Sequence, residues 1–163
     1  TYNIAKIWKN GNPTSLTDGT KKATAQSVYV SGADVYVAGY EHNGTAEVAK
    51  IWKNGSPISL TDGTKQGILL GGYVSGTDVY AAGYESNGTY EVAKVWKNGI
   101  VTILGDGTNY SFANAVAISG TDVYVSGDTY AGNVYTACYW KNGIRTSLTN
   151  GGNSSHANAI FVK

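Results

Sequence analysis

The chain alternates between short apolar segments, rich in β-branched and aromatic residues, and short polar segments rich in Gly, Asn, Asp and Thr. Gly or Pro interrupts every stretch that is long enough to form a helix. Segments such as Val35–Tyr40 and Val48–Lys53 are apolar on both faces, whereas a half-exposed strand would alternate. The pattern predicts an all-β protein whose sheets are covered on both sides.

One tetrapeptide divides this pattern into equal parts. Trp-Lys-Asn-Gly begins at Trp8, Trp52, Trp96 and Trp140, 44 residues apart each time (52 − 8, 96 − 52, 140 − 96). A period in this range is the signature of a repeat architecture. We therefore predict a single repeat domain over residues 1–163, with units at about 1–20 (partial), 21–64, 65–108, 109–152 and 153–163 (partial).

Each complete unit predicts four strands. In the first complete unit these are Ala25–Val30 (strand A), Val35–Tyr40 (strand B), Val48–Lys53 (strand C) and the edge that ends in Leu-Thr-Asp-Gly (strand D). The Asn-Gly pair after strand C favours a tight hairpin, because both central residues of a type I′ turn need a positive φ. Pro13 and Pro57 indicate that strand D is an exposed edge, since proline cannot donate to a central ladder. The last apolar segment, Ala157–Val162, predicts a final strand A.

Four-stranded sheets that repeat every 44 residues and are covered on both faces are typical of a β-propeller. Strand A would be crowded near the propeller axis, and it carries small residues: Ala25, Gly71, Gly72, Ala113, Ala115, Ala157 and Ala159. We predict three complete blades and a fourth that is split between the two ends of the chain. A β-trefoil is the alternative fold, but it needs three units and this chain shows four Trp-Lys-Asn-Gly copies.

At the level of fold, the whole chain resembles β-propeller repeat proteins. It is most similar to bacterial surface proteins that carry tandem Trp-Lys-Asn-Gly repeats. The Trp is not followed by the Asp of WD40 repeats, and the paired glycines of kelch repeats are missing. The resemblance implies a propeller architecture, with ring closure through the two ends of the chain, and it implies no particular activity.

The split blade lacks its strand B. The counterpart of residues 32–44, 13 residues long, is not in the sequence, and 163 + 13 = 176 = 4 × 44. Three explanations stay open: the chain is a piece of a larger repeat protein, which we favour; strand B comes from another chain; or two chains join head to tail into an eight-bladed ring. An oligomer is therefore a serious expectation.

Composition narrows the classes of partner. Only 14% of the residues are charged and the net charge is +1, which argues against nucleic acid or an anionic membrane surface as the main partner. No apolar run approaches the length of a membrane span. Cys138 is the one cysteine, so the chain has no internal disulfide. The thirteen tyrosines, with much Gly, Asn and Thr and little charge, favour an extracellular or cell-surface protein.

No catalytic or metal-binding pattern emerges. His42 and His156 occupy different places in the repeat and neither recurs, which argues against a metal site. No paired base is in register with Cys138, which we expect to pack as a small hydrophobe. The Asp residues at 34, 78 and 122, like those at 18, 62 and 106, are expected to cap local backbone N–H groups. We predict no cofactor.

The tryptophans are expected to pack between blades rather than to bind a ligand. The candidate binding surface is therefore a face built from the D-to-A and B-to-C loops, because binding residues of propellers lie on loops held by a rigid scaffold. The candidate ligand-binding residues on this face are Tyr40, Glu41, Asn43, Tyr84, Glu85, Asn87 and Tyr130. The sequence thus predicts a non-enzymatic binding or structural module that presents this face to a protein or polymer. The alternative is a lectin-like propeller with one weak sugar site per blade.

Overall fold

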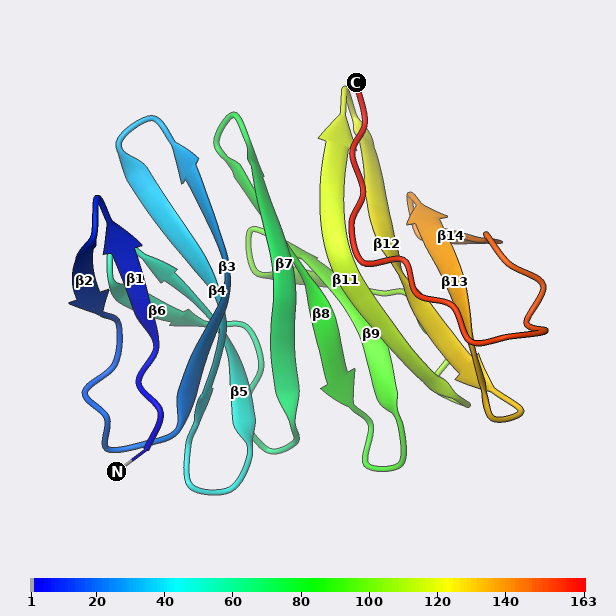
Figure 1. Ribbon diagram of the computed structural model, residues 1–163, viewed down its shortest axis with the longest axis horizontal. Helices are drawn as coiled ribbons and strands as arrows, with labels where there is room; N and C mark the ends of the chain where they lie inside the picture. Colours follow the sequence, from blue (N-terminus) through cyan, green and yellow to red (C-terminus); the bar gives the residue numbers. More distant parts are fainter. Residues whose placement is uncertain (1) are drawn as a thin grey trace.

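The computed structural model describes residues 2–163 and consists of β-strands and connecting turns, without a helix in that range (Figure 1). The all-β prediction is confirmed. The strands form three four-stranded antiparallel sheets and one two-stranded sheet. In every four-stranded sheet the strands follow one another in sequence order, as a simple meander.

The sheets have the following strands. The first sheet holds β1 (Lys6–Lys9) and β2 (Asn12–Ser15); the second holds β3 (Ala23–Ser31), β4 (Asp34–His42), β5 (Glu47–Lys53) and β6 (Ser56–Ser59). The third holds β7 (Gly67–Ser75), β8 (Asp78–Ser86), β9 (Glu91–Lys97) and β10 (Ile100–Ile103). The fourth holds β11 (Tyr110–Ser119), β12 (Asp122–Ala131), β13 (Val134–Lys141) and β14 (Ile144–Ser147).

The predicted Asn-Gly hairpins are confirmed. Asn54 and Gly55 join β5 to β6 with φ values of 50° and 86°, and the other three Trp-Lys-Asn-Gly copies have the same backbone. Asn and Gly tolerate this left-handed conformation, and the turn matches the twist of the strands it joins. The outer strands β2, β6, β10 and β14 are exposed along their whole length, as predicted for edge strands. β2 and β6 contain proline, whereas β10 is Ile-Val-Thr-Ile and exposes its apolar side chains.

A glycine in each second strand lets two backbones approach closely. A Cβ on Gly83 would lie 2.0 Å from the carbonyl oxygen of Ile68, and Gly39 and Gly127 are equally tight against strands β3 and β11. The partner strand has a bulge at the same level, between Leu69 and Gly71 in the third sheet. The bulge adds one residue and bends the inner strand, so any side chain at the glycine would collide with backbone.

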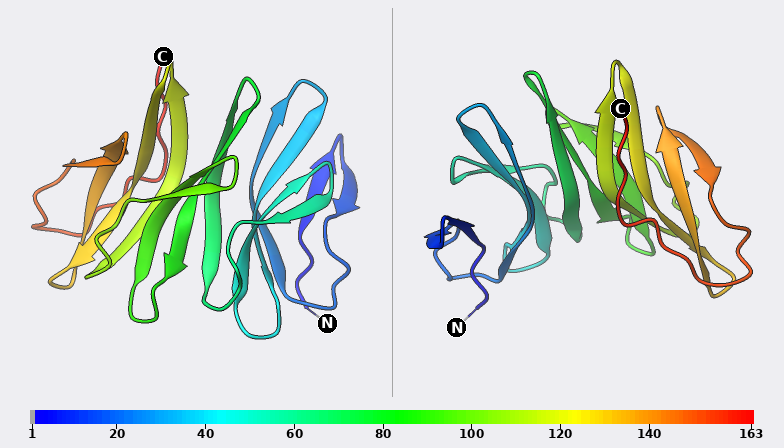
Figure 2. Two further views of the ribbon diagram at one scale, coloured as in Figure 1. Left: turned by 180° about the vertical axis from the view of Figure 1, so that it is seen from behind. Right: turned by 45° about the horizontal axis from the view of Figure 1, so that its top comes forward.

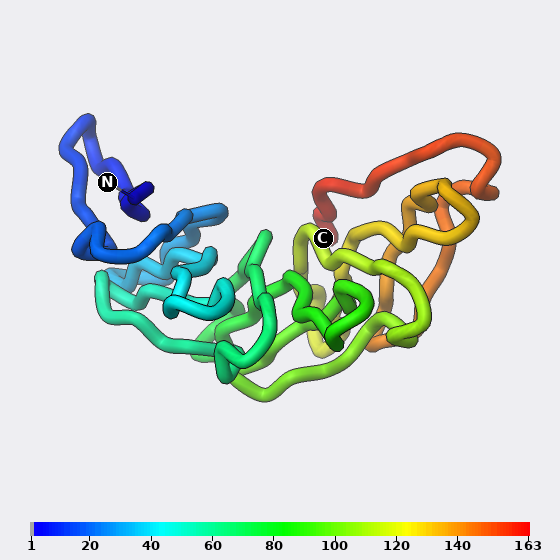
Figure 3. The backbone as a smooth tube through the Cα atoms, turned by 90° about the horizontal axis from the view of Figure 1, so that it is seen from below, coloured from blue at the N-terminus to red at the C-terminus, as the bar shows by residue number. Residues whose placement is uncertain are grey.

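The four sheets stand side by side in chain order and pack through their faces. The packed strand pairs include β3 with β7 and β7 with β11. Seen from below, the molecule is an open arc, with the N-terminal sheet at one end and the fourth sheet at the other, from which the C-terminal segment runs back toward the middle (Figure 3). Figure 2 shows the same succession of sheets from two further sides. A separate apolar cluster fills each of the three junctions between sheets.

The final strand predicted over Ala157–Val162 does not form. This segment runs along the fourth sheet without ladder pairing (Figure 1). It is held by side chains instead: Asp128 accepts from the N–H of Ala157, Asn114 donates to the carbonyl of Ala157, and Ser119 donates to that of Lys163. Residues 157–162 therefore lie beside the fourth sheet without joining any of the described sheets.

Candidate functional site

The two predicted sets of loops lie together on one face. The side-chain amide of Asn43, in the turn after β4, donates to the carbonyl of Gly63 at 2.9 Å, and Asn87 donates to Gly107 at the same distance. The amide oxygen of Asn43 also accepts from the N–H groups of Thr45 and Ala46. These predicted site residues therefore hold a B-to-C turn against the following D-to-A loop, and their polar groups are already used.

The predicted glutamates are partners of lysines on the neighbouring strand. Glu41 pairs with Lys50 and Glu85 with Lys94, and all four side chains are no more than 20% exposed. The third copy replaces both members together, with Thr129 and Cys138 in their places. Because the pair is present or absent as a unit, its role is to hold neighbouring strands together.

The predicted tyrosines behave differently from one another. Tyr40 is 9% exposed and lies beneath the ammonium of Lys22, 5.5 Å from the ring centre. Burial, with a smaller contribution from the Glu91 charge, raises the pKa of Tyr84 to about 12. Glu85 and Asn87 line a depression of about 210 Å³ between the B-to-C turn and β10. Tyr40 is thus part of the packing, whereas Tyr84 and Tyr130 both join a larger aromatic group.

That group is a continuous row of six half-buried rings and one exposed ring, that of His156, which begins at the junction of the third and fourth sheets. We call it the aromatic row: Tyr84, Tyr90, Tyr110, Phe112, Tyr130, Tyr135 and His156. Neighbouring ring centres are 4.7 to 6.4 Å apart, and the contacts range from tilted to edge-on. Such separations are those of favourable aromatic pairs. The strand and turn ends that carry these rings adjoin the loop face.

The aromatic row is not a feature of every repeat. At the positions of Tyr110, Phe112, Tyr130 and Tyr135 the preceding unit has Gln66, Ile68, Ser86 and Glu91. The loop face is therefore asymmetric, with its rings gathered over one junction. Our sequence reasoning named two members of the row, Tyr84 and Tyr130. It missed the others because it searched for residues that recur, while this cluster arises where the third copy departs from the repeat.

A buried carboxylate stands at the end of the row. Asp128 is 4% exposed and replaces Tyr40 and Tyr84 of the other copies. It accepts from Asn114 Nδ2 at 3.1 Å and from the N–H of Ala157 at 2.9 Å, and His156 Nδ1 lies 3.0 Å from its Oδ2. Sequence reasoning missed this pair; the signal was a carboxylate at a position that is otherwise aromatic. Within residues 2–163, His156 makes no hydrogen bond with a hydroxyl or thiol group.

The recurring motifs serve the fold. Asn54 accepts from the N–H of Val35 at 2.9 Å and donates to Asp34 at 2.7 Å, and Lys53 pairs with the same carboxylate at 2.8 Å. The prediction that Asp34 caps local N–H groups is therefore wrong, because its partners come from the next hairpin. The Lys53 ammonium, and next the Asn54 amide, hold the pKa of Asp34 below its usual value. The other Asp series is confirmed as local caps: Asp62, for example, accepts from the N–H of Thr64.

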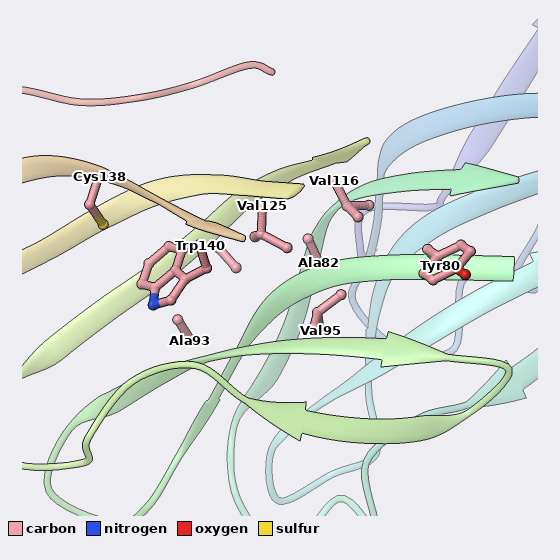
Figure 4. Close-up of a cluster of buried hydrophobic side chains, with 9 residues drawn as sticks. Tyr80, Ala82, Ala93, Val95, Val116, Val125, Cys138 and Trp140 are labelled. Carbon is pink, nitrogen blue, oxygen red and sulfur yellow. The ribbon is translucent and has the colours of Figure 1, made fainter. Parts of the chain in front are cut away.

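The tryptophans of the second, third and fourth sheets pack between sheets, as predicted. Trp52, Trp96 and Trp140 are 0–2% exposed, and Figure 4 shows Trp140 among Ala93, Val125 and Cys138. Cys138 is fully buried, and burial raises the pKa of its thiol, so it behaves as the expected small hydrophobe. Trp8 differs from its three counterparts, with 66% of its surface exposed.

Across residues 2–163, no group of three or more His, Cys, Asp or Glu side chains could hold a metal ion. The same range has no helix long and apolar enough to cross a membrane. The chain matches no protein-family model and no curated protein.

Proposed function

We propose that this chain is a non-enzymatic binding or structural module of the β-propeller class, which presents its loop face to a protein or polymer. In this reading each four-stranded meander is a 44-residue blade, and the N-terminal sheet and the C-terminal segment each supply part of a further, split blade. The succession of face-packed meanders along an arc supports the propeller reading (Figure 3). The weak charge and the abundant Tyr, Gly, Asn and Thr favour an extracellular setting.

The aromatic row is the observation that carries the binding proposal. Seven half-buried or exposed rings in mutual contact offer a surface that is apolar on the ring faces and polar at the hydroxyl groups. Ligand sites have this composition, with apolar walls and a few polar groups that fix orientation. An extended polymer could lie along the row and contact several rings at once.

A carbohydrate polymer is the second candidate that this observation favours. Tyrosine faces match the apolar face of a pyranose ring, while Asn133, to which Tyr130 donates at 3.3 Å, and His156 place polar groups beside them. The rings gather over one junction, so the site we propose is single. This differs from the weak site per blade that the sequence alone suggested.

Titration of the chain with soluble neutral polysaccharides tests whether the aromatic row binds a carbohydrate polymer. Tyr130→Ala and Tyr135→Ala should each weaken binding about tenfold, as the loss of a central aromatic contact does. Tyr73→Ala is the matched control, because Tyr73 is 39% exposed on β7 and lies outside the row. If the chain binds polysaccharide equally well in all three variants, the row is not the site. Binding of extracellular-matrix or cell-wall protein with the same sensitivity would instead select a protein ligand for this face.

A further inference from the structure

Every junction between neighbouring sheets contains the same apolar pair. The pairs are Trp52 with Leu16, Trp96 with Leu60, and Trp140 with Leu104, each member of a common cluster. The Leu always precedes its Trp by 36 residues (52 − 16, 96 − 60, 140 − 104). In the last junction Trp140 Nε1 also donates to the carbonyl of Leu104 at 3.1 Å. The pair is the repeated unit of sheet-to-sheet packing.

One more Trp and one more Leu occupy the same repeat positions, namely Trp8 and Leu148. Within residues 2–163 neither belongs to one of the three Trp–Leu clusters. Trp8 is 66% exposed, and Leu148 is 57% exposed, whereas Leu16 in the first junction is 9% exposed. Trp8 belongs to β1 at one end of the arc, and Leu148 follows β14 at the other (Figure 3).

One further contact between sheets involves two positions that recur, with exposed apolar residues, near the ends of the chain. At the junction of the second and third sheets, the ring of Tyr29 lies beside Gly72. In repeat register, Phe161 stands at the position of Tyr29 (161 − 29 = 3 × 44), and Val28 stands at the position of Gly72 (72 − 28 = 44). Phe161 is 81% exposed and Val28 is 59% exposed.

An apolar groove marks the incomplete junction. It lies between β1 and the β3–β4 hairpin, has a volume of about 770 Å³, and is lined by Trp8, Val28, Val30 and Val35 among others. At the next junction β7 is packed against both β3 and β4 of the sheet before it. The groove therefore lies where the first two strands of a preceding sheet would cover β3.

We propose that copies of this chain dock head to tail, with Trp8 of one copy packed on Leu148 of the next, and Val28 packed on Phe161. A second copy is the occupant that fits, because the other end of the same chain carries the missing halves of both contacts in repeat register. The arc keeps a chain's own ends apart (Figure 3). Two copies that each pack both of their ends against the other form a closed dimer. Copies that each pack their two ends against two different neighbours form a larger assembly. This association is independent of the loop face and of what that face binds.

Light scattering over a range of protein concentrations tests the proposal. The expected mass is 34.2 kDa (2 × 17.1) or a higher multiple of the 17.1 kDa chain. Trp8→Ser and Leu148→Ser should each weaken association about tenfold or more, because each removes an apolar side chain from the centre of the contact. Ile100→Ser is the matched control, since Ile100 is 76% exposed on β10, away from both ends. A chain that stays at 17.1 kDa at every concentration overturns the proposal, as does association that neither end variant weakens.

Cross-linking identifies which ends meet. A chain with Lys9→Cys is mixed with a chain with Ser147→Cys, and a short bismaleimide is added; both positions are exposed and adjoin Trp8 and Leu148, which stay in place, and the natural Cys138 is fully buried. We expect a covalent two-chain product in this mixture and none when Lys9→Cys is mixed with Ile100→Cys. A chain that carries both end substitutions and is linked only to itself, as a single chain, would show closure within one copy and would overturn the head-to-tail contact. Circular dichroism of each variant verifies that it is folded.

Discussion

At the scale of single residues, the recurring Asp and Lys side chains of this protein form ion pairs between one hairpin and the next. Asp34, Asp78 and Asp122 each pair with the lysine of the following Trp-Lys-Asn-Gly motif at 2.7 to 2.8 Å. The lysine also lies over the ring of the Tyr two residues after the Asp, as Lys53 does over Tyr36 at 5.3 Å. One short motif thus combines an ion pair, an amide bridge and a cation–π contact at the surface.

These carboxylates should make stability depend on acid pH. The lysine partner, followed by the Asn of the motif, lowers the pKa of Asp34, Asp78 and Asp122 in the folded chain. A lowered folded pKa stabilises the fold at pH values above the unfolded value of about 3.9, and this contribution is lost as pH falls through the folded pKa. A triple Asp→Asn variant should therefore lose less stability than the parent between about pH 4 and pH 2.

Urea unfolding followed at several pH values measures this effect. The matched variant replaces the partners, Lys53, Lys97 and Lys141, with Met, and should flatten the same acid limb because it removes the leading cause of the shift. Both variants should be somewhat less stable than the parent at neutral pH. An unchanged acid limb in both would mean that these exposed pairs do not contribute to folding.

At the scale of strands, the first two complete units (residues 21–64 and 65–108) each join two neighbouring strands by a charge pair that the last unit lacks. Glu85 on β8 and Lys94 on β9 are 20% and 17% exposed, so neither charge is fully hydrated. Removal of one partner leaves the other as an uncompensated, half-buried charge. The natural replacement in the last copy, Thr129 with Cys138, leaves neither.

A double-mutant cycle measures the coupling within this pair. Glu85→Thr alone and Lys94→Cys alone should each lower the free energy of unfolding by about 1 to 2 kcal/mol. The double variant reproduces the combination of the last copy, and it should lose about 1 kcal/mol less than the sum of the single losses. The free energies come from urea unfolding under reducing conditions. Strictly additive losses would show that the pair does not hold β8 and β9 together.

At the scale of the whole molecule, the sequence predicted the period and its hairpins because each depends on residues that are close together. Asn54 and Gly55 need only a local backbone conformation, and this is seen in all four copies. The partners of Asp34 were mispredicted because they lie about 20 residues further on, in a different hairpin. Asp128 and His156 were missed since they are 28 residues apart and neither recurs. The exposure of Trp8 was missed because equal spacing treats the four tryptophans as equivalent.

The junctions should make the four tryptophans energetically unequal, although they occupy the same place in the repeat. Trp96 is 2% exposed at the central junction, between the second and third sheets, and Trp8 has 66% of its surface in solvent. Trp96→Ala should lower the free energy of unfolding by about 3 to 5 kcal/mol, because it empties a packed core. Trp8→Ala should change it by about 0.5 kcal/mol or less at low protein concentration, where copies do not associate.

The tryptophan variants should also differ in the shape of their urea unfolding curves. Each sheet contacts its chain neighbours, so stability is close to a sum of sheet terms and junction terms. Loss of the central junction in Trp96→Ala should uncouple the first two sheets from the last two, and urea unfolding should broaden or separate into two transitions. Trp52→Ala affects the junction with the small β1–β2 sheet, so it should leave a single main transition over β3–β14. Equal losses and one sharp transition in all three variants would mean that the tryptophan clusters do not couple the sheets.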